Sequence, residues 1–276
     1  KERFQSTPWI ITPHFHPSWS MWGGRKRRTL RNFYDSRIGK STMESADLIT
    51  CVSNHEKEML VKEIGINDDS IKIIFNGINW NDWEKIPDKE KFRNKYPGIS
   101  DKFIIFAGRL ATNKGIPDLI DAISLEGSKR FDLVVMGADM GLGKELDKLA
   151  LSKNIKMHRL GHVDDEIYRS ALSAAEVLVL PSEYEAFGIV LLEAAAAGTP
   201  VVATRVGGIP EAMSSEKNGL LVEYKDSKAL SKSIFSILDD DSLSREMGLF
   251  GREFSKGFSW SKIVDELEKE YQKLLA

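Results

Sequence analysis

Hydrophobic and polar positions alternate in blocks along the chain after residue 100. Short runs of consecutive apolar residues, typical of strands buried on both faces of a parallel sheet, are separated by stretches of good helix formers. The expected strands are 103–108, 131–136, 155–160, 177–180, 200–203 and 219–222. The expected helices are 117–125, 144–152, 164–175 and 188–197. This order predicts a doubly wound α/β domain over residues 97–258.

The first hundred residues show the same pattern with fewer strands. Strands are expected at 8–12, 47–52 and 71–75, and the capping box Ser53-Asn-His-Glu56 predicts a helix that runs to about Ile64. Three strands are too few for a complete doubly wound domain. Residues 1–96 are therefore expected to be the second half of such a domain, its first half absent, ending in a charged linker at 83–96.

The last segment of the chain, residues 259–276, predicts one amphipathic helix. Its apolar residues recur at helical spacing on one face, at Ile263, Val264, Leu267, Tyr271 and Leu274. A face of this kind needs a docking surface elsewhere in the protein.

Two carboxylates lie at an expected strand-to-helix junction within residues 181–200. Glu185 falls on the loop after a strand, and Glu193 lies two turns into the next helix. Both could face the crevice at the carboxyl ends of the strands, where open α/β sheets bind ligands. The alternative is a solvated loop acid and an ordinary helix acid. For Glu193 this alternative is harder to hold, because apolar residues surround it and a carboxylate among them needs a partner.

The loop from Gly108 to Gly115 carries two cations at the carboxyl end of another expected strand. Arg109 and Lys114 stand beside the start of the helix that follows. Backbone amides, the helix dipole and two cations suit a diphosphate, although two solvated loop cations would give the same pattern. The glycine spacing of a P-loop is missing here, and at 39–42 a P-loop is excluded because Tyr34 stands in place of its first glycine.

The histidines do not predict a metal site. His14 and His16 follow an expected strand, so His14 could lie in the crevice, but no nearby acids complete a set of metal ligands. Asp164-Asp165 and 239–241 fit helix starts and surface turns better than cation ligands. No serine lies in a nucleophile elbow, which leaves hydrolysis through an acyl-enzyme unsupported.

Composition and charge narrow the setting of the protein. The 276 residues carry a net charge of −2 and one cysteine, Cys51, which excludes a disulfide framework and favours a reducing cytoplasm. Residues 1–40 hold nine bases against two acids, a net charge of +7, so the rest of the chain carries −9. Trp19–Arg31 mixes bases with tryptophans and could bind an anionic membrane surface or a phosphorylated acceptor, or be a solvated helix face. No motif for nucleic acid accompanies it.

Several motifs occur in the order found in one enzyme family. They are Val52-Ser53 at a helix start, Asn76-Gly77-Ile78, Gly108-Arg109 with Lys114-Gly115, Glu185-x7-Glu193, Gly198-Thr-Pro-Val-Val202, Gly207-Gly208-Ile-Pro-Glu211 and Asn218-Gly219-Leu-Leu-Val222. Over nearly the whole chain this set resembles the retaining glycosyltransferases of family 4. The resemblance implies the GT-B fold, in which two Rossmann-like doubly wound domains face a cleft, here with the first domain incomplete.

The resemblance also implies a nucleotide-diphosphate sugar as donor (UDP-, GDP- or ADP-sugar) and no tightly bound cofactor. Arg109 and Lys114 would bind the diphosphate, and Glu193 would accept hydrogen bonds from the ribose hydroxyls. Glu185 would lie by the donor sugar. The further donor-binding residues would be Gly108, His162 and Val163 at the base, and Ala186, Phe187, Gly188 and Ile189 beside the sugar and phosphates.

The chemistry implied is metal-independent transfer of a hexosyl group with retention. The expected catalytic set is Glu185, Arg109, Lys114 and His14, with His14 matching the family's Thr-x-His histidine on the opposite domain. Residues 259–276 would cross back to the first domain. The acceptor is expected to be a glycan, a lipid-linked molecule or a phosphorylated molecule. The protein is expected in the cytoplasm, with possible peripheral contact at the inner membrane face through Trp19–Arg31.

One departure from the family pattern qualifies these expectations. Family members begin with a strand and a glycine-rich loop, and none precedes Lys1 here. The chain is therefore expected to be a truncated form that binds a nucleoside diphosphate and transfers weakly or not at all. The alternatives are a GT-B-like nucleotide-sugar 2-epimerase and a non-catalytic nucleotide-binding fragment.

Overall fold

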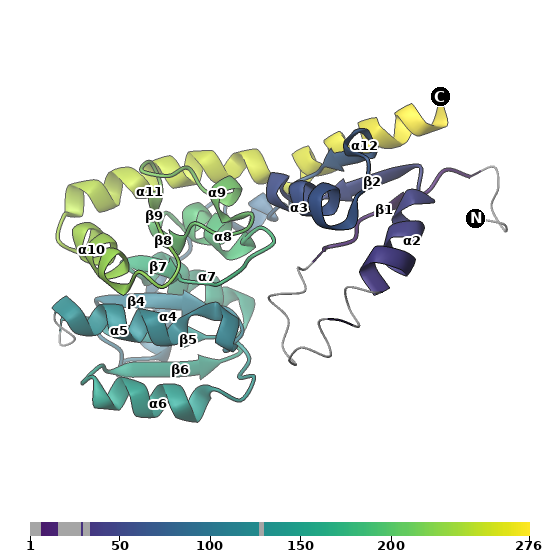
Figure 1. Ribbon diagram of the computed structural model, residues 1–276. Coiled ribbons are helices and arrows are strands. Elements are labelled where there is room, and N and C mark those ends of the chain that lie inside the picture. Colours follow the sequence, from purple (N-terminus) through teal and green to yellow (C-terminus); the bar gives the residue numbers. More distant parts are fainter. Residues whose placement is uncertain (1–6, 16–28, 30–33, 127–129) are drawn as a thin grey trace. The chain divides into compact units, whose positions relative to one another are not determined.

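The protein consists of two compact units in a computed structural model that describes residues 7–15, 29, 34–126 and 130–276. The first unit comprises Lys1–Gly77 and Trp260–Ala276, and the second comprises Ile78–Ser259 (Figure 1). Each unit contains a parallel sheet with helices, as the sequence pattern predicts.

The second unit contains a six-stranded sheet with the order β6-β5-β4-β7-β8-β9, and all neighbouring strands are parallel. The strands are β4 (Phe103–Ala107), β5 (Asp132–Met136), β6 (Met157–Gly161), β7 (Val177–Leu180), β8 (Val201–Thr204) and β9 (Gly219–Val222). The strand order reverses between β4 and β7. Open α/β sheets bind ligands at the carboxyl ends of the strands beside such a switch point.

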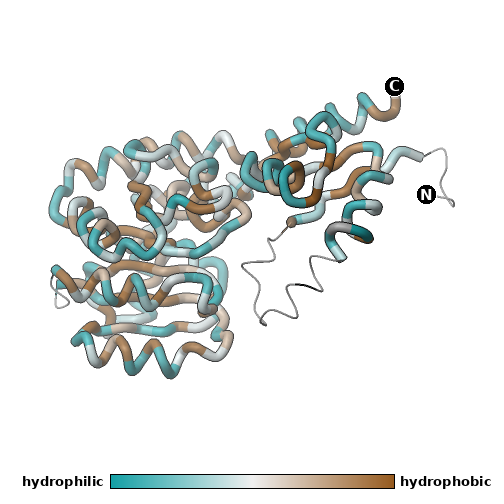
Figure 2. The backbone as a smooth tube through the Cα atoms, in the orientation of Figure 1, coloured by the Kyte–Doolittle hydropathy of each residue, from teal (hydrophilic) through white to brown (hydrophobic). Residues whose placement is uncertain are grey.

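Helices connect these strands. They are α4 (Lys89–Lys95), α5 (Ile116–Glu126), α6 (Gly143–Ser152), α7 (Asp165–Ala174), α8 (Ile189–Ala197), α9 (Ile209–Ala212), α10 (Ser227–Leu238) and α11 (Asp241–Ser255), with 3-10 turns at Trp80–Asp82, Thr112–Lys114 and Lys256–Phe258. Every residue of β4, β5, β7 and β8 is buried, because these strands form the central layer of the unit. Figure 2 shows hydrophobic residues following these strands, while the helices alternate between hydrophobic and hydrophilic positions.

The six expected strands and four expected helices of this unit are confirmed to within a few residues. Asp164 and Asp240 cap the amino ends of α7 and α11, as expected for helix starts. The stretch 83–96 differs from a linker because it contains α4, which Asp88 caps. The backbone N–H of Phe92 donates to Ser170 Oγ on α7 at 2.8 Å, and the Phe92 ring is buried. The two units accordingly divide at Gly77 rather than at residue 96.

The first unit has a three-stranded parallel sheet with the order β1-β2-β3. Its strands are β1 (Ile10–Ile11), β2 (Leu48–Cys51) and β3 (Ile71–Ile73). Its helical segments are a π-helix at Asp35–Gly39, α2 (Lys40–Glu44), α3 (Asn54–Met59), a π-helix at Leu60–Ile64, a 3-10 turn at Asp68–Ser70 and α12 (Trp260–Leu275). The expected capping box is half formed. Ser53 Oγ accepts the Glu56 N–H at 3.1 Å, but the Glu56 carboxylate turns to other backbone amides.

The carboxyl-terminal helix α12 groups with the first unit. Ile263 is its buried residue, and Glu270 forms an ion pair with Lys72 of β3 at 3.7 Å. Val264 and Tyr271, expected on the same apolar face, remain 44% exposed. The helix is therefore held by part of the predicted face.

The two ends of the second unit lie side by side. The backbone N–H of Ile78 donates to the Phe258 carbonyl at 2.8 Å, and a parallel bridge pairs Ile78 with Ser259. The chain thus enters and leaves this unit at one place.

Asp132, at the start of β5, ties together three segments of the second unit. Its carboxylate accepts hydrogen bonds from the Ser100 N–H at 2.9 Å, Lys156 Nζ at 2.9 Å and His158 Nε2 at 2.8 Å. Burial raises the pKa of Asp132, but the hydrogen bonds from Lys156, Ser100 and His158 outweigh it and hold that pKa below its ordinary value.

The stabilisation from Asp132 is expected to depend on pH. A carboxyl whose pKa is depressed in the folded state stabilises above its unfolded pKa, about 4, and loses this contribution as the pH falls through the folded pKa. Asp132→Asn should therefore lower the melting temperature at pH 7 by about 2–6 °C, from about 1–2 kcal/mol of lost hydrogen bonding. The difference from wild type should shrink below about pH 4. The control is Asp101→Asn, whose side chain is 88% exposed; a pH-independent difference for Asp132→Asn contradicts the assignment.

Candidate functional site

The loop between β7 and α8 is held by hydrogen bonds to its backbone carbonyls. Thr204 Oγ1 donates to the Ser182 carbonyl at 2.6 Å, and the Gly208 N–H donates to the Glu185 carbonyl at 2.9 Å. A Cβ atom at Gly207 would lie 1.9 Å from the Glu185 carbonyl oxygen, and Gly207 has a φ of +53°. Glycine is thus required at 207, and Glu185 is held in place from the segment after β8.

Lys114 and Glu185 meet as a largely buried ion pair. Lys114 Nζ lies 2.5 Å from Glu185 Oε1, and the side chains are only 13% and 16% exposed. Ser182 Oγ donates to the same oxygen at 2.8 Å. Gly115 allows this approach, because a Cβ atom there would lie 1.9 Å from the Pro181 carbonyl oxygen. The structure therefore brings together two residues that the sequence placed at the ends of different strands.

Arg109 follows the β4 strand and its Gly108 turn, and it is exposed. Within the residues that the structure describes, it takes part in none of the ion pairs. A free cation thus stands next in the chain to Gly108, while the charge of Lys114 is neutralised by Glu185.

Glu193, on α8, has the partner that its apolar surroundings require. Tyr168, on α7, donates its hydroxyl to Glu193 Oε2 at 2.5 Å. Burial raises the pKa of the Glu193 carboxyl, and the Tyr168 hydrogen bond opposes this effect. Burial and the neighbouring Glu193 raise the pKa of Tyr168 well above its ordinary value, so its hydroxyl stays protonated. The sequence gives no indication that Tyr168 is the partner of Glu193, because the two residues lie on different helices.

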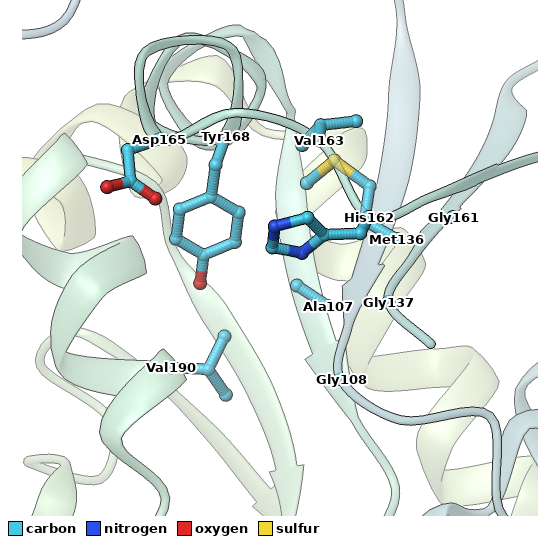
Figure 3. Close-up of a pocket in the computed structure, with 10 residues that line it drawn as sticks. All are labelled: Ala107, Gly108, Met136, Gly137, Gly161, His162, Val163, Asp165, Tyr168 and Val190. Carbon is cyan, nitrogen blue, oxygen red and sulfur yellow. The ribbon is translucent and has the colours of Figure 1, made fainter. Parts of the chain in front are cut away.

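A pocket of about 330 Å³ opens at the carboxyl ends of β4, β5 and β6 (Figure 3). Figure 3 shows the His162 and Tyr168 rings projecting into it, with the Tyr168 hydroxyl pointing toward Val190. The lining residues are Ala107, Gly108, Met136, Gly137, Gly161, His162, Val163, Asp165, Tyr168 and Val190. Three of the predicted binding residues, Gly108, His162 and Val163, thus lie around one cavity.

The other predicted binding residues form the junction between the loop and α8. Phe187 is buried, with its ring 5.9 Å from that of Phe258, so its side chain faces away from solvent. Gly188 precedes α8 with a φ of +97°, and no side chain caps this helix. The Leu191 N–H donates to the Gly188 carbonyl at 2.9 Å, so the amides of the exposed Ile189 and of Val190 are the ones that remain for a ligand. Ala186 lies between Glu185 and this turn.

His14 lies in the first unit, shortly after β1, and has a left-handed backbone with a φ of +45°. The segment is held by the buried Glu56, whose carboxylate accepts the N–H groups of Phe15 and, at 2.8 Å, Val52. Burial raises the pKa of Glu56, while these hydrogen bonds and the charge of His14 lower it. The position of His14 is therefore defined relative to the other residues of the first unit. His16 and the segment Trp19–Arg31, except Thr29, lie outside the described residues.

Metal-binding clusters and membrane-spanning helices are both missing from the described residues. Over these ranges, no group of three or more His, Cys, Asp or Glu side chains is arranged to hold a metal ion. Among the helices in the described part of the chain, none combines the length and apolar character that a membrane crossing requires.

Comparison with known proteins identifies the class of this fold. Residues 88–254 match the family model described as "Glycosyl transferases group 1", and residues 2–81 match "Glycosyltransferase Family 4". An uncharacterized glycosyltransferase of Methanocaldococcus jannaschii is 31% identical over 98% of this chain and 69% of its own length. Alpha-maltose-1-phosphate synthase of Mycolicibacterium smegmatis is 29% identical over 98% of this chain and 74% of its own length.

Solved structures give the same class. Sucrose-phosphate synthase from Thermosynechococcus elongatus aligns with a TM-score of 0.84 and 28% identity, over 99% of this chain and 70% of that one. HepE from Anabaena, in complex with UDP and glucose, aligns with a TM-score of 0.82 and 21% identity, over 96% and 72% of the two chains.

The fold and the relatives together define a glycosyltransferase with two Rossmann-like units of the GT-B type. The chain belongs to the glycosyl transferases group 1 family, with a family 4 glycosyltransferase segment at its start. The family and fold expected from the motifs are confirmed.

Proposed function

We propose that the second unit binds the nucleoside diphosphate part of a nucleotide-sugar donor and that the protein transfers the hexosyl group of this donor. The observation that carries the proposal is the grouping around the strand ends beside the switch point. The Lys114–Glu185 pair, Arg109, the pocket at His162 and the Tyr168–Glu193 pair all belong to loops and helices that follow β4, β6 and β7. The solved neighbour HepE, described with UDP and glucose, supports a donor of this kind.

Each part of this grouping fits one part of the donor. The pocket lined by His162 and Val163 is apolar enough for a base, and Glu193 is an acceptor for ribose hydroxyls. Arg109 and Lys114 supply charge-assisted hydrogen bonds to phosphate oxygens, because a lysine ammonium that already contacts Glu185 keeps two further N–H donors. Glu185 would then lie next to the sugar attached to the β-phosphate.

The proposed reaction exchanges one bond at the anomeric carbon. The bond to the β-phosphate oxygen breaks, a bond to an acceptor hydroxyl forms on the same face, and the proton of that hydroxyl leaves with the nucleoside diphosphate. Negative charge grows on the departing phosphate, and Arg109 and Lys114 are placed to stabilise it without a divalent ion. His14, from the first unit, completes the proposed catalytic set.

The proposed acceptor is a sugar or polyol that carries phosphate, a glycan or a lipid-linked molecule. The relatives named alpha-maltose-1-phosphate synthase and D-inositol 3-phosphate glycosyltransferase support the phosphorylated class. The D-inositol 3-phosphate glycosyltransferase of Corynebacterium diphtheriae is 30% identical over 83% of this chain.

Donor binding can be tested by thermal unfolding with a panel of ligands. The panel contains UDP, GDP, ADP and their glucose, mannose, galactose and N-acetylglucosamine forms. Ligands with one of the three bases should stabilise the protein clearly, and ligands with the other two bases should stabilise it weakly. A ligand that binds only the folded protein stabilises it by about 2.7 kcal/mol at one hundred times its dissociation constant, which corresponds to about 5–10 °C. Inorganic pyrophosphate is the control for simple anion binding. If none of the nucleoside diphosphates raises the melting temperature above this control, the proposed function is wrong.

A further inference from the structure

The hydroxyl of Tyr168 engages the one carboxylate assigned above to the ribose. It donates to Glu193 Oε2 at 2.5 Å, although Tyr168 and Glu193 are 25 residues apart in the sequence. The Tyr168 side chain also lines the pocket in which the base is proposed to bind. One aromatic residue therefore contacts both the cavity and the acid beside it.

The hydrogen bond uses only half of the carboxylate. Tyr168 occupies Oε2, and over the described residues no hydrogen bond reaches Oε1. A carboxylate rotates about its last bond unless one oxygen is held. Fixing Oε2 therefore fixes the direction of Oε1, which can accept a hydrogen bond from a ligand.

The charged surroundings of Glu193 make this partner necessary. Burial raises the pKa of Glu193, and Asp165 on α7 raises it further by repulsion. The guanidinium of Arg252 on α11 does not offset this, because it donates to the Ala196 carbonyl near the carboxyl end of α8. Among these groups Tyr168 alone favours the ionised carboxylate, since its hydroxyl donates and its own pKa is raised well above the ordinary value.

We propose that Tyr168 is a positioning residue for ribose recognition, whose hydroxyl holds Glu193 by Oε2 so that Oε1 accepts from a ribose hydroxyl. This inference rests on the proposed function, because it assigns to Glu193 the ribose of the nucleoside diphosphate. Tyr168 acts on the ribose through Glu193, while its ring forms one wall of the pocket.

The test compares Tyr168→Phe with the wild-type chain by calorimetry. The ligands are whichever of UDP, GDP and ADP the wild type binds most tightly, and its 2′,3′-dideoxy form. Loss of the positioning hydrogen bond should weaken the ribonucleotide by about 10-fold and the dideoxy ligand by about 2-fold or less. Tyr271→Phe on α12, at a residue 44% exposed, is the matched control and should change neither affinity.

The pH dependence separates positioning from packing. Without the Tyr168 hydroxyl the pKa of Glu193 rises further, so the loss of ribonucleotide affinity on acidification should begin at a higher pH in Tyr168→Phe than in wild type. A variant that only loosened the pocket would lose both ligands equally and keep the wild-type pH profile.

The outcomes are distinguishable. Equal weakening of both ligands, unchanged affinity or tighter binding of the ribonucleotide by Tyr168→Phe overturns the inference while leaving the proposed function standing. If the wild-type chain binds none of the three nucleoside diphosphates, the proposed function itself fails, and the inference fails with it.

Discussion

Lys114→Met is expected to weaken binding of a nucleoside diphosphate by about 10- to 150-fold. A hydrogen bond to a charged group contributes about 1.5–3 kcal/mol, and this range converts to that loss of affinity. Methionine keeps most of the apolar stem of lysine while removing the charge. The measurement is calorimetric titration with the best-binding nucleoside diphosphate, and Arg109→Ala should show a loss in the same range.

The Lys114–Glu185 pair makes a sharper version of this experiment possible. In Glu185→Gln, Lys114 no longer contacts a carboxylate, so affinity for the diphosphate should stay the same or increase. The double variant Lys114→Met with Glu185→Gln should bind as weakly as Lys114→Met alone, and it leaves no unpaired charge from this pair. Lys144→Met, at an exposed position of α6, is the matched control. Wild-type affinity in both Lys114→Met and Arg109→Ala would remove the diphosphate assignment.

The same variants address turnover. If Arg109 and Lys114 stabilise the departing diphosphate more strongly than the bound donor, turnover should fall by about 10- to 150-fold even at saturating donor. Glu185→Gln should then separate the two effects, with diphosphate binding retained and transfer reduced, because Glu185 is proposed to lie by the sugar.

Gly207→Ala is expected to destabilise the folded protein more than Asp132→Asn does. Its Cβ atom would lie 1.9 Å from the Glu185 carbonyl oxygen, in a residue with a φ of +53°. Left-handed backbone costs about 1–2 kcal/mol for alanine, and overlap with fixed atoms costs about 1–3 kcal/mol. The combined loss of about 2–5 kcal/mol should lower the melting temperature by roughly 5–15 °C.

A matched glycine makes this result interpretable. Gly98→Ala adds the same methyl group where no atom lies within 4 Å, so its stability should stay within about 0.5 kcal/mol of wild type. Gly207→Ala should also reduce transfer, because displacing the Glu185 carbonyl moves the carboxylate that is proposed to lie by the sugar. Equal melting temperatures for the two alanine variants would show that the loop at Glu185 shifts freely.

The sequence predicted the four central strands of the second unit well because each is dominated by consecutive apolar residues. Helix α11 was not predicted, because most of its buried residues are small. These are Gly248, Gly251 and Ser255, and Met247 is the one large buried residue. Such a face offers few large apolar side chains, although it packs closely: a Cβ atom at Gly248 would lie 2.3 Å from the Gly198 carbonyl oxygen. Helix α4 was missed for a related reason, since Phe92 is the one buried residue of an otherwise charged segment.

The site was predictable as a set of residues and less so as a set of contacts. Motif order placed Lys114, Glu185 and Glu193 near strand ends, and the apolar neighbours of Glu193 required a partner for it. The identity of that partner could not be predicted, because Tyr168 reaches Glu193 through the packing of α7 on α8. The direct pairing of Lys114 with Glu185 likewise depends on the close approach of two loops at Gly115 and Pro181.

The pairing of Ile78 with Phe258 and Ser259 bears on whether the second unit can be exchanged between proteins. Residues 78–259 are an insert in the chain order of the first unit, and both ends of the insert lie at one short ladder. A segment whose termini meet can be excised, or exchanged for a homologous one, by joining the chain at a single seam. The proposed donor-binding unit can therefore be exchanged as one continuous segment that begins at Ile78 and ends at Ser259.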